Sequence, residues 1–364
     1  MAEINIDRVW KYYGKTVAVR DLTLNCADGE FLSVLGPSGC GKSSTLRMLA
    51  GLEHITAGEI RFAGKRVNDL PPKDRDIAMV FENYALYPHR TVYNNIANAL
   101  RLRRMPQAEI DKRVRRAAEM LEIGRLLDRR PHELSGGQKQ RVAIGRAIVR
   151  EPQLFLFDEP IAHLDAKLRA HMRGELKHLQ RTLGTSMIYV THDQLEALSM
   201  ADKIAVMHNG VLQQYGTPAD IYNHPVNEWV AGFVGEPPMN FVDCELAGAG
   251  GDICVTHPSF SVPVTPEQRA RLSDTTAGPV RLGIRPDDVT VAMERGPETP
   301  IEAKVFITEP IGGDMLVDTQ LADGRRLLVR TKPGFSGRAG DTCWLGFNTS
   351  RWHLFSSADG RAYF

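Results

Sequence analysis

The sequence is poor in cysteine, in long apolar runs and in net charge, and each shortage narrows what the protein can be. Its five cysteines are odd in number and show no CxxC spacing, which is typical of a reducing, cytoplasmic compartment. No run approaches the ~18 apolar residues that span a membrane. The opening residues MAEINIDRVW lack the basic-then-apolar pattern of a signal peptide. A net charge of +1 gives no general argument for nucleic acid or acidic partners, so we expect a partner to carry any membrane role.

Length and patterning predict two domains. The chain has 364 residues, 43% of them hydrophobic, which is enough for a sizeable core. Strand patterns alternate with helical patterns up to about residue 235, and the stretch Gly235-Glu236-Pro237-Pro238 is the expected linker. Beyond it, only short strands are expected, at residues 241–246, 260–264, 280–284, 301–308, 315–321, 326–330 and 342–347. We therefore expect an α/β domain over 1–235 and a β domain, a small barrel or sandwich, over 236–364.

Within the first domain, the patterns predict two sheets and a helical part. Alternating runs at residues 4–10, 16–26 and 59–67 predict an antiparallel sheet. Short apolar strands that alternate with helices predict a second, mostly parallel sheet with helices on both faces. Residues 88–150 are expected to form a helical subdomain, broken at Pro106 and Pro131. This part is rich in arginine, but interleaved acidic residues favour a solvated helix face over a nucleic-acid patch.

A glycine-rich loop between a strand pattern and a helical pattern carries the strongest functional signal. It matches G-x-x-x-x-G-K-[ST], the phosphate-binding loop of many nucleotide-binding proteins. Gly36 and Gly41 are expected to let the backbone curl around an anion, and the helix that begins near Lys42 points its positive end there. Lys42 should reach the β- and γ-phosphates, and the Ser43 hydroxyl should hold Mg²⁺. The expected nucleotide-binding residues are Gly36, Pro37, Ser38, Gly39, Cys40, Gly41, Lys42, Ser43 and Ser44. Cys40 is either a spacer or a thiol open to alkylation.

A second glycine-rich turn makes the pattern specific. Ser135, Gly136, Gly137 and Gln138 precede a helical run and could offer backbone donors to a second anion. Together with residues 36–43 and 154–159, Leu164-Asp165 and His192, this turn resembles the ATPase subunit of an ABC transporter over residues 4–235. Three further stretches, at 84–89, 164–169 and 216–222, are similar to importers of sugars, polyols and glycerol phosphates. Such subunits end in an OB-like regulatory domain, which agrees with the β pattern of the tail.

Four side chains have expected roles in ATP hydrolysis. Asp158, at the end of a strand, is placed to bind Mg²⁺ through water, although a lone aspartate there is usually a helix cap. Glu159 is the candidate general base for the attacking water, against the simpler interpretation of a surface glutamate. His192 follows another strand, and sheet topology should bring it beside Glu159, where it could donate to the γ-phosphate. Tyr13 is the candidate for stacking on adenine, with Tyr12 as its rival.

The resemblance also implies an assembly. The turn at Ser135 would close over ATP held by a second ATPase subunit, identical or a sister, with Asp165 at the interface. ATP and Mg²⁺ are the expected cofactors, and two membrane permeases and an extracytoplasmic solute-binding protein the expected partners, with no nucleic acid. The aromatic loop 84–88 would contact a permease at the cytoplasmic face of a bacterial inner membrane. Two other functions are weighed: a soluble ABC ATPase acting on DNA or ribosomes, and a regulatory module that sequesters a cytoplasmic regulator.

Two segments depart from the family pattern. Glu82 stands where glutamine is expected, so a hard oxygen ligand for Mg²⁺ is kept while an amide donor is lost. We expect an altered Mg²⁺ dependence or slower turnover, and we retain Glu82 as a metal-ligand and catalytic candidate. Ala162 and His163 replace the common serine and asparagine of the interface loop. Together these departures suggest pairing with a non-identical ATPase in some complexes.

Overall fold

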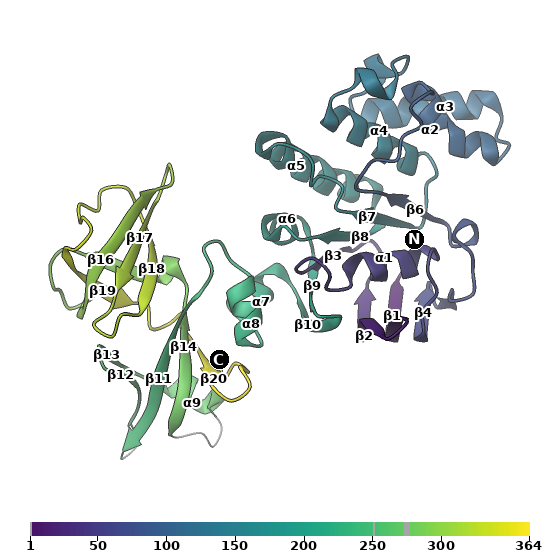
Figure 1. Ribbon diagram of the computed structural model, residues 1–364. Coiled ribbons are helices and arrows are strands. Elements are labelled where there is room, and N and C mark those ends of the chain that lie inside the picture. The colour runs from purple at the N-terminus through teal and green to yellow at the C-terminus, as the bar shows by residue number, and fades with distance from the viewer. Residues whose placement is uncertain (1, 250–251, 273–276) are drawn as a thin grey trace. The chain divides into compact units, whose positions relative to one another are not determined.

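The computed structural model describes residues 2–249, 252–272 and 277–364 (Figure 1). The chain divides into two compact units, Met1–Pro218 and Ala219–Phe364, and each is described by itself. No helix in the described part of the chain is both long and apolar enough to cross a membrane.

The first unit is built on a six-stranded sheet in the order β10-β9-β3-β8-β7-β6. Its strands are β3 (Phe31–Leu35), β6 (Ile77–Val80), β7 (Leu154–Asp158), β8 (Ser186–Thr191), β9 (Lys203–His208) and β10 (Val211–Gly216). All neighbours pair in parallel except β9 and β10, which form a hairpin that turns at Asn209-Gly210, a preferred turn dipeptide. Every residue of β3 and β8 is buried, as expected of strands covered on both faces. The predicted mostly parallel sheet is confirmed.

A second, antiparallel sheet has the order β2-β1-β4-β5. Its strands are β1 (Ile4–Tyr13), β2 (Thr16–Cys26), β4 (Ala57–Phe62) and β5 (Lys65–Arg66). The single run predicted at 59–67 is instead a hairpin, because Ala63-Gly64 turns the chain between β4 and β5. Helix α1 (Lys42–Ala50) lies between the two sheets in Figure 1. One hydrophobic core joins all three layers, including Leu22, Leu46 and Leu156.

Helices fill the rest of the first unit. The expected helical stretch consists of α2 (Val92–Leu102), α3 (Gln107–Met120) and α4 (Gly136–Ile148), with 3₁₀ turns at Gly124–Leu126 and Pro131–Glu133. Its predicted interruptions are confirmed, since Pro106 caps α3 and Pro131 opens a 3₁₀ turn. Helix α5 (Ala166–Leu183) follows β7, α6 (Gln194–Met200) follows β8, and a 3₁₀ turn at Pro72–Asp74 precedes β6. In Figure 1, α5 and α1 lie on opposite sides of the six-stranded sheet.

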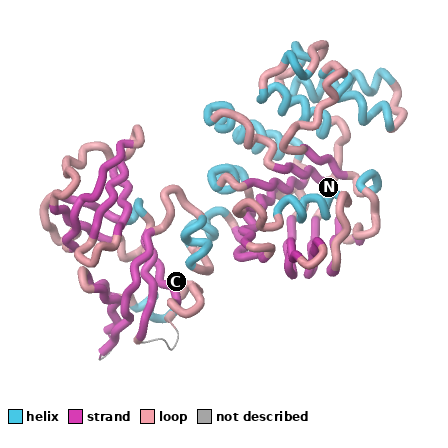
Figure 2. Tube along the Cα trace, in the orientation of Figure 1, coloured by secondary structure: helices cyan, strands magenta, loops and turns pink. Residues whose placement is uncertain are grey.

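Most of the regular secondary structure of the second unit is strand, as Figure 2 shows. The short helices α7 (Pro218–Asn223) and α8 (Glu228–Phe233) precede two antiparallel sheets. The first has the order β13-β12-β11-β14-β20, with strands β11 (Asn240–Ala249), β12 (Asp252–His257), β13 (Phe260–Pro263), β14 (Gly278–Ile284) and β20 (His353–Ser356). The second has the order β15-β19-β16-β17-β18, with strands β15 (Val289–Ala292), β16 (Ile301–Pro310), β17 (Met315–Gln320), β18 (Arg326–Thr331) and β19 (Thr342–Phe347). One core, including Leu282, Val329 and Leu345, joins both sheets.

The β character expected over residues 236–364 is confirmed, although the described residues there include one α-helix. Helix α9 (Pro266–Arg271) lies where only strands were expected. Thr265 and Gln268 form a reciprocal capping box, and Pro266 occupies the first helical position. A 3₁₀ turn at Pro286–Asp288 follows β14. The sequence therefore contains a helix-start signal, the capping box, that a reading for strand periodicity alone misses.

Candidate functional site

The phosphate-loop motif connects β3 to α1, and its glycines act differently from expectation. Gly39 and Gly41 are left-handed, with φ of +79° and +101°, and Gly41 caps α1. Gly36 is not left-handed. A Cβ atom added to it would lie 2.3 Å from the carbonyl oxygen of Met207 and 2.6 Å from the Cys40 sulfur. The expectation that Gly36 supplies curvature is therefore wrong: close packing against β9 requires it, and Gly39 supplies the turn.

Lys42 lies inside this loop. Its Nζ donates to the carbonyl oxygens of Gly36 at 2.8 Å and Pro37 at 2.9 Å, and the residue is only 4% exposed. The Cys40 thiol is also buried, 3.9 Å from Nζ. Burial raises the pKa of Cys40, although the charge of Lys42 opposes the rise. Cys40 is therefore a packed spacer rather than a reactive thiol.

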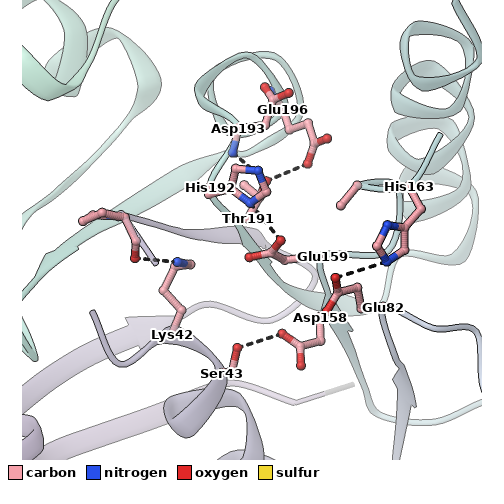
Figure 3. Close-up of polar contacts among 12 residues, drawn as sticks. Lys42, Ser43, Glu82, Asp158, Glu159, His163, Thr191, His192, Asp193 and Glu196 are labelled. Atoms are coloured by element: carbon pink, nitrogen blue, oxygen red, sulfur yellow. Dashed lines mark hydrogen bonds and ion pairs between the residues drawn. The ribbon is translucent and has the colours of Figure 1, made fainter. Parts of the chain in front are cut away.

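Ser43 and Asp158 bring two hard oxygens together at one end of the loop (Figure 3). The Ser43 hydroxyl donates to Asp158 Oδ1 at 3.2 Å. Burial raises the pKa of Asp158; the Ser43 hydrogen bond opposes this rise, and the charges of Glu159 and Glu82 add to it. A divalent cation would offset the cost of this half-buried carboxylate, so the oxygen pair fits Mg²⁺ chemically. Among the described residues, no group of three or more His, Cys, Asp or Glu side chains could hold a metal ion alone.

Glu159 and His192 meet at the ends of two neighbouring strands, as the sheet topology predicted. His192 Nδ1 lies 2.8 Å from Glu159 Oε2 (Figure 3). Glu159 directly follows β7, has a left-handed backbone with φ of +45°, and donates its N–H to the carbonyl of Val190 in β8 at 3.0 Å. The backbone of one strand end is thereby fixed to the next. This constrained geometry aims the carboxylate at the imidazole.

The loop that carries His192 is anchored by residues that the sequence did not single out. Glu196 is buried and accepts hydrogen bonds from Tyr189 at 2.8 Å and Thr191 at 2.7 Å. Burial raises the pKa of Glu196, and these two hydrogen bonds oppose the rise. Thr191 also accepts from the N–H of Asp193 at 2.9 Å, which closes the turn around His192. The sequence signal for this anchor was the position of Glu196, four residues after a histidine at the end of a strand.

Glu82 lies near the same cluster and has an unexpected partner. His163 Nε2 lies 3.2 Å from Glu82 Oε1 (Figure 3). The two residues come from separate loops, one after β6 and one between β7 and α5. The structure thus brings together both departures from the family pattern.

The second glycine-rich turn is the start of α4. Ser135 Oγ accepts from the N–H of Gln138 at 3.4 Å, and Gln138 Oε1 accepts from the N–H of Ser135 at 3.1 Å. A Cβ on Gly137 would lie 2.7 Å from a Leu168 methyl, so this turn packs on α5. Asp165 caps α5 and accepts from the N–H of Leu168 at 2.9 Å. No hydrogen bond joins this turn to Lys42 or Ser43 within the described chain.

The two tyrosines at the end of β1 have different surroundings. The Tyr13 hydroxyl donates to Glu53 and lies 3.3 Å from the Ser44 hydroxyl in α1. Tyr12 instead stacks on Trp10, with ring centroids 5.9 Å apart. Both rings are exposed, at 44% for Tyr13 and 39% for Tyr12. Tyr13 is therefore the one tied to the phosphate-loop helix.

The aromatic loop after β6 is held by a side chain from α4. Arg146 donates to the carbonyl oxygen of Tyr84 at 3.1 Å and to that of Ala85. Both residues have left-handed backbones, with φ of +61° and +44°. The buried Asn95 amide fixes the other end by accepting from the N–H of Tyr87 at 2.8 Å. Tyr87 itself remains partly exposed.

Similarity to known proteins extends over both units. Residues 19–162 match the family described as ABC transporter, residues 235–289 the MalK OB fold domain, and residues 282–355 the TOBE domain. The chain is 48% identical over 376 residues to the trehalose/maltose import ATP-binding protein MalK of Thermococcus litoralis, covering 100% of both chains. It is 47% identical over 367 residues to the sn-glycerol-3-phosphate import ATP-binding protein UgpC 3 of Rhizobium etli, covering 99% of each.

A solved structure agrees with the first unit. The dimeric post-hydrolysis structure of the ATP-binding cassette MJ0796, bound to ADP and Pi, matches with a TM-score of 0.54 and 32% identity. The match covers 59% of this chain and 98% of that one. Together with the full-length similarity to the two relatives, this match confirms the resemblance inferred from the motifs. The chain belongs to the ABC transporter family, as an ATP-binding subunit of the importer type that includes MalK and UgpC.

Proposed function

We propose that this chain powers uptake of a sugar, polyol or glycerol-phosphate solute by hydrolysing ATP to ADP and phosphate between two cassettes. The observation that carries the proposal is the 2.8 Å contact between Glu159 and His192 beside the Ser43–Asp158 pair, in a chain whose relatives are import ATPases. The printed names of those relatives, trehalose/maltose and sn-glycerol-3-phosphate importers, support the solute class.

In this proposal, the phosphate loop binds and orients the nucleotide. Backbone N–H groups of residues 38–43 and the Lys42 ammonium hold the phosphates, and Tyr13 stacks on adenine beside α1. Ser43 and, through water, Asp158 would hold Mg²⁺, with Glu82 as an additional oxygen donor. When bound, Mg²⁺ neutralises charge on the β- and γ-phosphate oxygens. Phosphate oxygens would supply ligands that the protein side chains lack.

Glu159 then takes a proton from the attacking water, and His192 holds that carboxylate in place. The Nδ1–H group of His192 donates to Glu159 Oε2, and this hydrogen bond orients the second carboxylate oxygen. For His192 to donate to the γ-phosphate as well, its ring must carry a second proton on Nε2. The Glu196 anchor keeps the ring from turning away.

The assembly is part of the same proposal. Ser135, Gly136, Gly137 and Gln138 at the start of α4 would serve ATP on a second cassette, identical or a sister, with Asp165 at the interface. Two permeases and an extracytoplasmic solute-binding protein complete the importer, and the loop at Tyr87 meets a permease at the cytoplasmic face of a bacterial inner membrane.

We also propose residues 1–235 as the ATPase domain, with residues 88–150 as its helical subdomain, and residues 236–364 as the regulatory domain. The compact units divide earlier, after Pro218.

The test is a Glu159→Gln variant of the full-length chain. Loss of the general base should slow phosphate release by about 100-fold or more while leaving ATP binding intact, and closed dimers should accumulate. Glu175→Gln, a change at a partly exposed residue of α5, serves as the matched control and should hydrolyse ATP at the normal rate. Phosphate release by Glu159→Gln at the normal rate would show that another group is the base.

A further inference from the structure

The Glu82–His163 contact joins two loops that flank the proposed Mg²⁺ site. The two side chains are 52% and 59% exposed, and His163 Nε2 lies 3.2 Å from Glu82 Oε1. A neutral imidazole with its proton on Nε2 already donates to a carboxylate, so the contact does not need a charged histidine. The hydrogen bond uses one oxygen of Glu82 and leaves Oε2 outside this contact.

Glu82 lies at the same edge of the sheet as the proposed Mg²⁺ site (Figure 3). Strand β6 pairs in parallel with β7, with Val80 opposite Phe157, so Glu82 and Asp158 lie at neighbouring strand ends. A glutamate carries two acceptor oxygens and no donor, so it cannot fix its own orientation by donating to a neighbour. An N–H from the facing loop is therefore what can hold this carboxylate in one orientation.

We propose that His163 is a positioning residue for Glu82: it binds Oε1 and thereby keeps Oε2 available to Mg²⁺ held by Ser43 and Asp158. The proposal rests on the proposed function, because it concerns the cation that accompanies ATP. It assigns a role to His163, which the sequence marked only as an unusual residue at its position. It also makes the two departures from the family pattern one compensated change instead of two separate defects.

An exposed pair of this kind contributes little to folding, so stability cannot be what the contact serves. His171 and Glu175 on α5 offer a comparison within the same unit. His171 Nε2 lies 3.9 Å from Glu175 Oε1, and its side chain is about as exposed as that of His163. The His171 pair lies along one helix, whereas the His163 pair bridges two loops of the site. A histidine lost from α5 should leave Mg²⁺ binding untouched.

The test is a double-mutant cycle on the full-length chain, with Mg²⁺ titrated into its complex with a non-hydrolysable ATP analogue. We expect His163→Ala to weaken Mg²⁺ binding by about twofold to fivefold, the range of an exposed ionic hydrogen bond. In a Glu82→Ala background the same change should have no effect, because its target is gone. His163→Gln, which restores an N–H donor, should recover much of the loss, and His171→Ala should match the wild type.

Two results would overturn the proposal: unchanged Mg²⁺ affinity in His163→Ala, or equal weakening with and without Glu82. Affinity for the analogue without Mg²⁺ should stay constant across the cycle, and a parallel loss there would also count against a positioning role. A failure of the proposed function looks different. In that case the wild-type chain would not bind the analogue, or would bind it equally well after Lys42→Ala.

Discussion

His353, the first residue of β20, makes the stability of the second unit depend on pH. The residue is 8% exposed, and its Nδ1 lies 3.3 Å from the carbonyl oxygen of Phe364. Burial lowers the pKa of His353 to about 4, and the positive charge of Arg285 adds to the effect. In the unfolded chain the pKa returns to about 6.5. The unfolded state therefore binds a proton more tightly, and stability falls as the pH drops from about 6.5 towards 4.

The size of this loss follows from the two pKa values. At pH 8 the imidazole is neutral in both states and contributes nothing. At pH 5 it is mostly protonated in the unfolded chain and mostly neutral in the folded one, which lowers the free energy of unfolding by about 2 kcal/mol. A His353→Gln variant lacks the titrating group. Its free energy of unfolding should therefore fall by about 2 kcal/mol less than that of the wild type between these pH values.

Urea unfolding at pH 8 and pH 5 measures the difference. Trp344 and Trp352 lie in the second unit, and the Trp352 ring packs edge-on against Phe364, so intrinsic fluorescence reports on its unfolding. Comparing the pH dependence of the two proteins removes contributions from other titrating groups. Equal losses in the wild type and in His353→Gln would refute the reasoning, because they would show that His353 does not stay neutral in the folded protein.

Three further predictions concern the ATP site. Gly36→Ala should destabilise the first unit by about 1–3 kcal/mol, because its Cβ would lie 2.3 Å from the Met207 carbonyl oxygen; an unchanged thermal unfolding temperature would contradict this. Tyr13→Ala should weaken binding of a fluorescent ATP analogue by about 1 kcal/mol while Tyr12→Ala leaves it unchanged, and the reverse order would make Tyr12 the stacking residue. His192→Ala should lower kcat for ATP hydrolysis by about 100-fold with little change in KM, because it orients Glu159 and not the bound nucleotide; a change confined to KM would contradict this.

The positions of candidate site residues could be predicted from the sequence where these residues lie at the end of a strand. Asp158 ends β7, Glu159 and His192 directly follow β7 and β8, and the carboxyl ends of parallel neighbours meet at one edge of a sheet. The contact between Glu159 and His192 therefore follows from the order of strands alone. The phosphate-loop motif was equally accessible, because its spacing is dictated by the anion that it is built to hold.

Contacts between loops could not be predicted in this way. Glu82 and His163 lie on segments whose meeting is set by no strand register or helical period. The role of Gly36 depends on Met207, which approaches it from β9, far along the chain. In the second unit, strands β12, β15 and β20 were not predicted; β15 and β20 have four residues each, too few for a clear alternation, whereas β12 has six. Tertiary packing decides all of these features.

The hydrogen bonds from Arg146 to the aromatic loop have a mechanical consequence. A left-handed residue other than glycine costs roughly 1–2 kcal/mol, so Tyr84 and Ala85 store a few kcal/mol of backbone strain. The guanidinium that offsets this strain belongs to α4, the helix that Ser135 caps at its other end. A rotation of α4 that withdraws Arg146 removes these hydrogen bonds and releases the aromatic loop from its strained conformation. The start of α4, where we propose that Ser135 contacts nucleotide on a second cassette, is therefore connected to the shape of the aromatic loop through one helix.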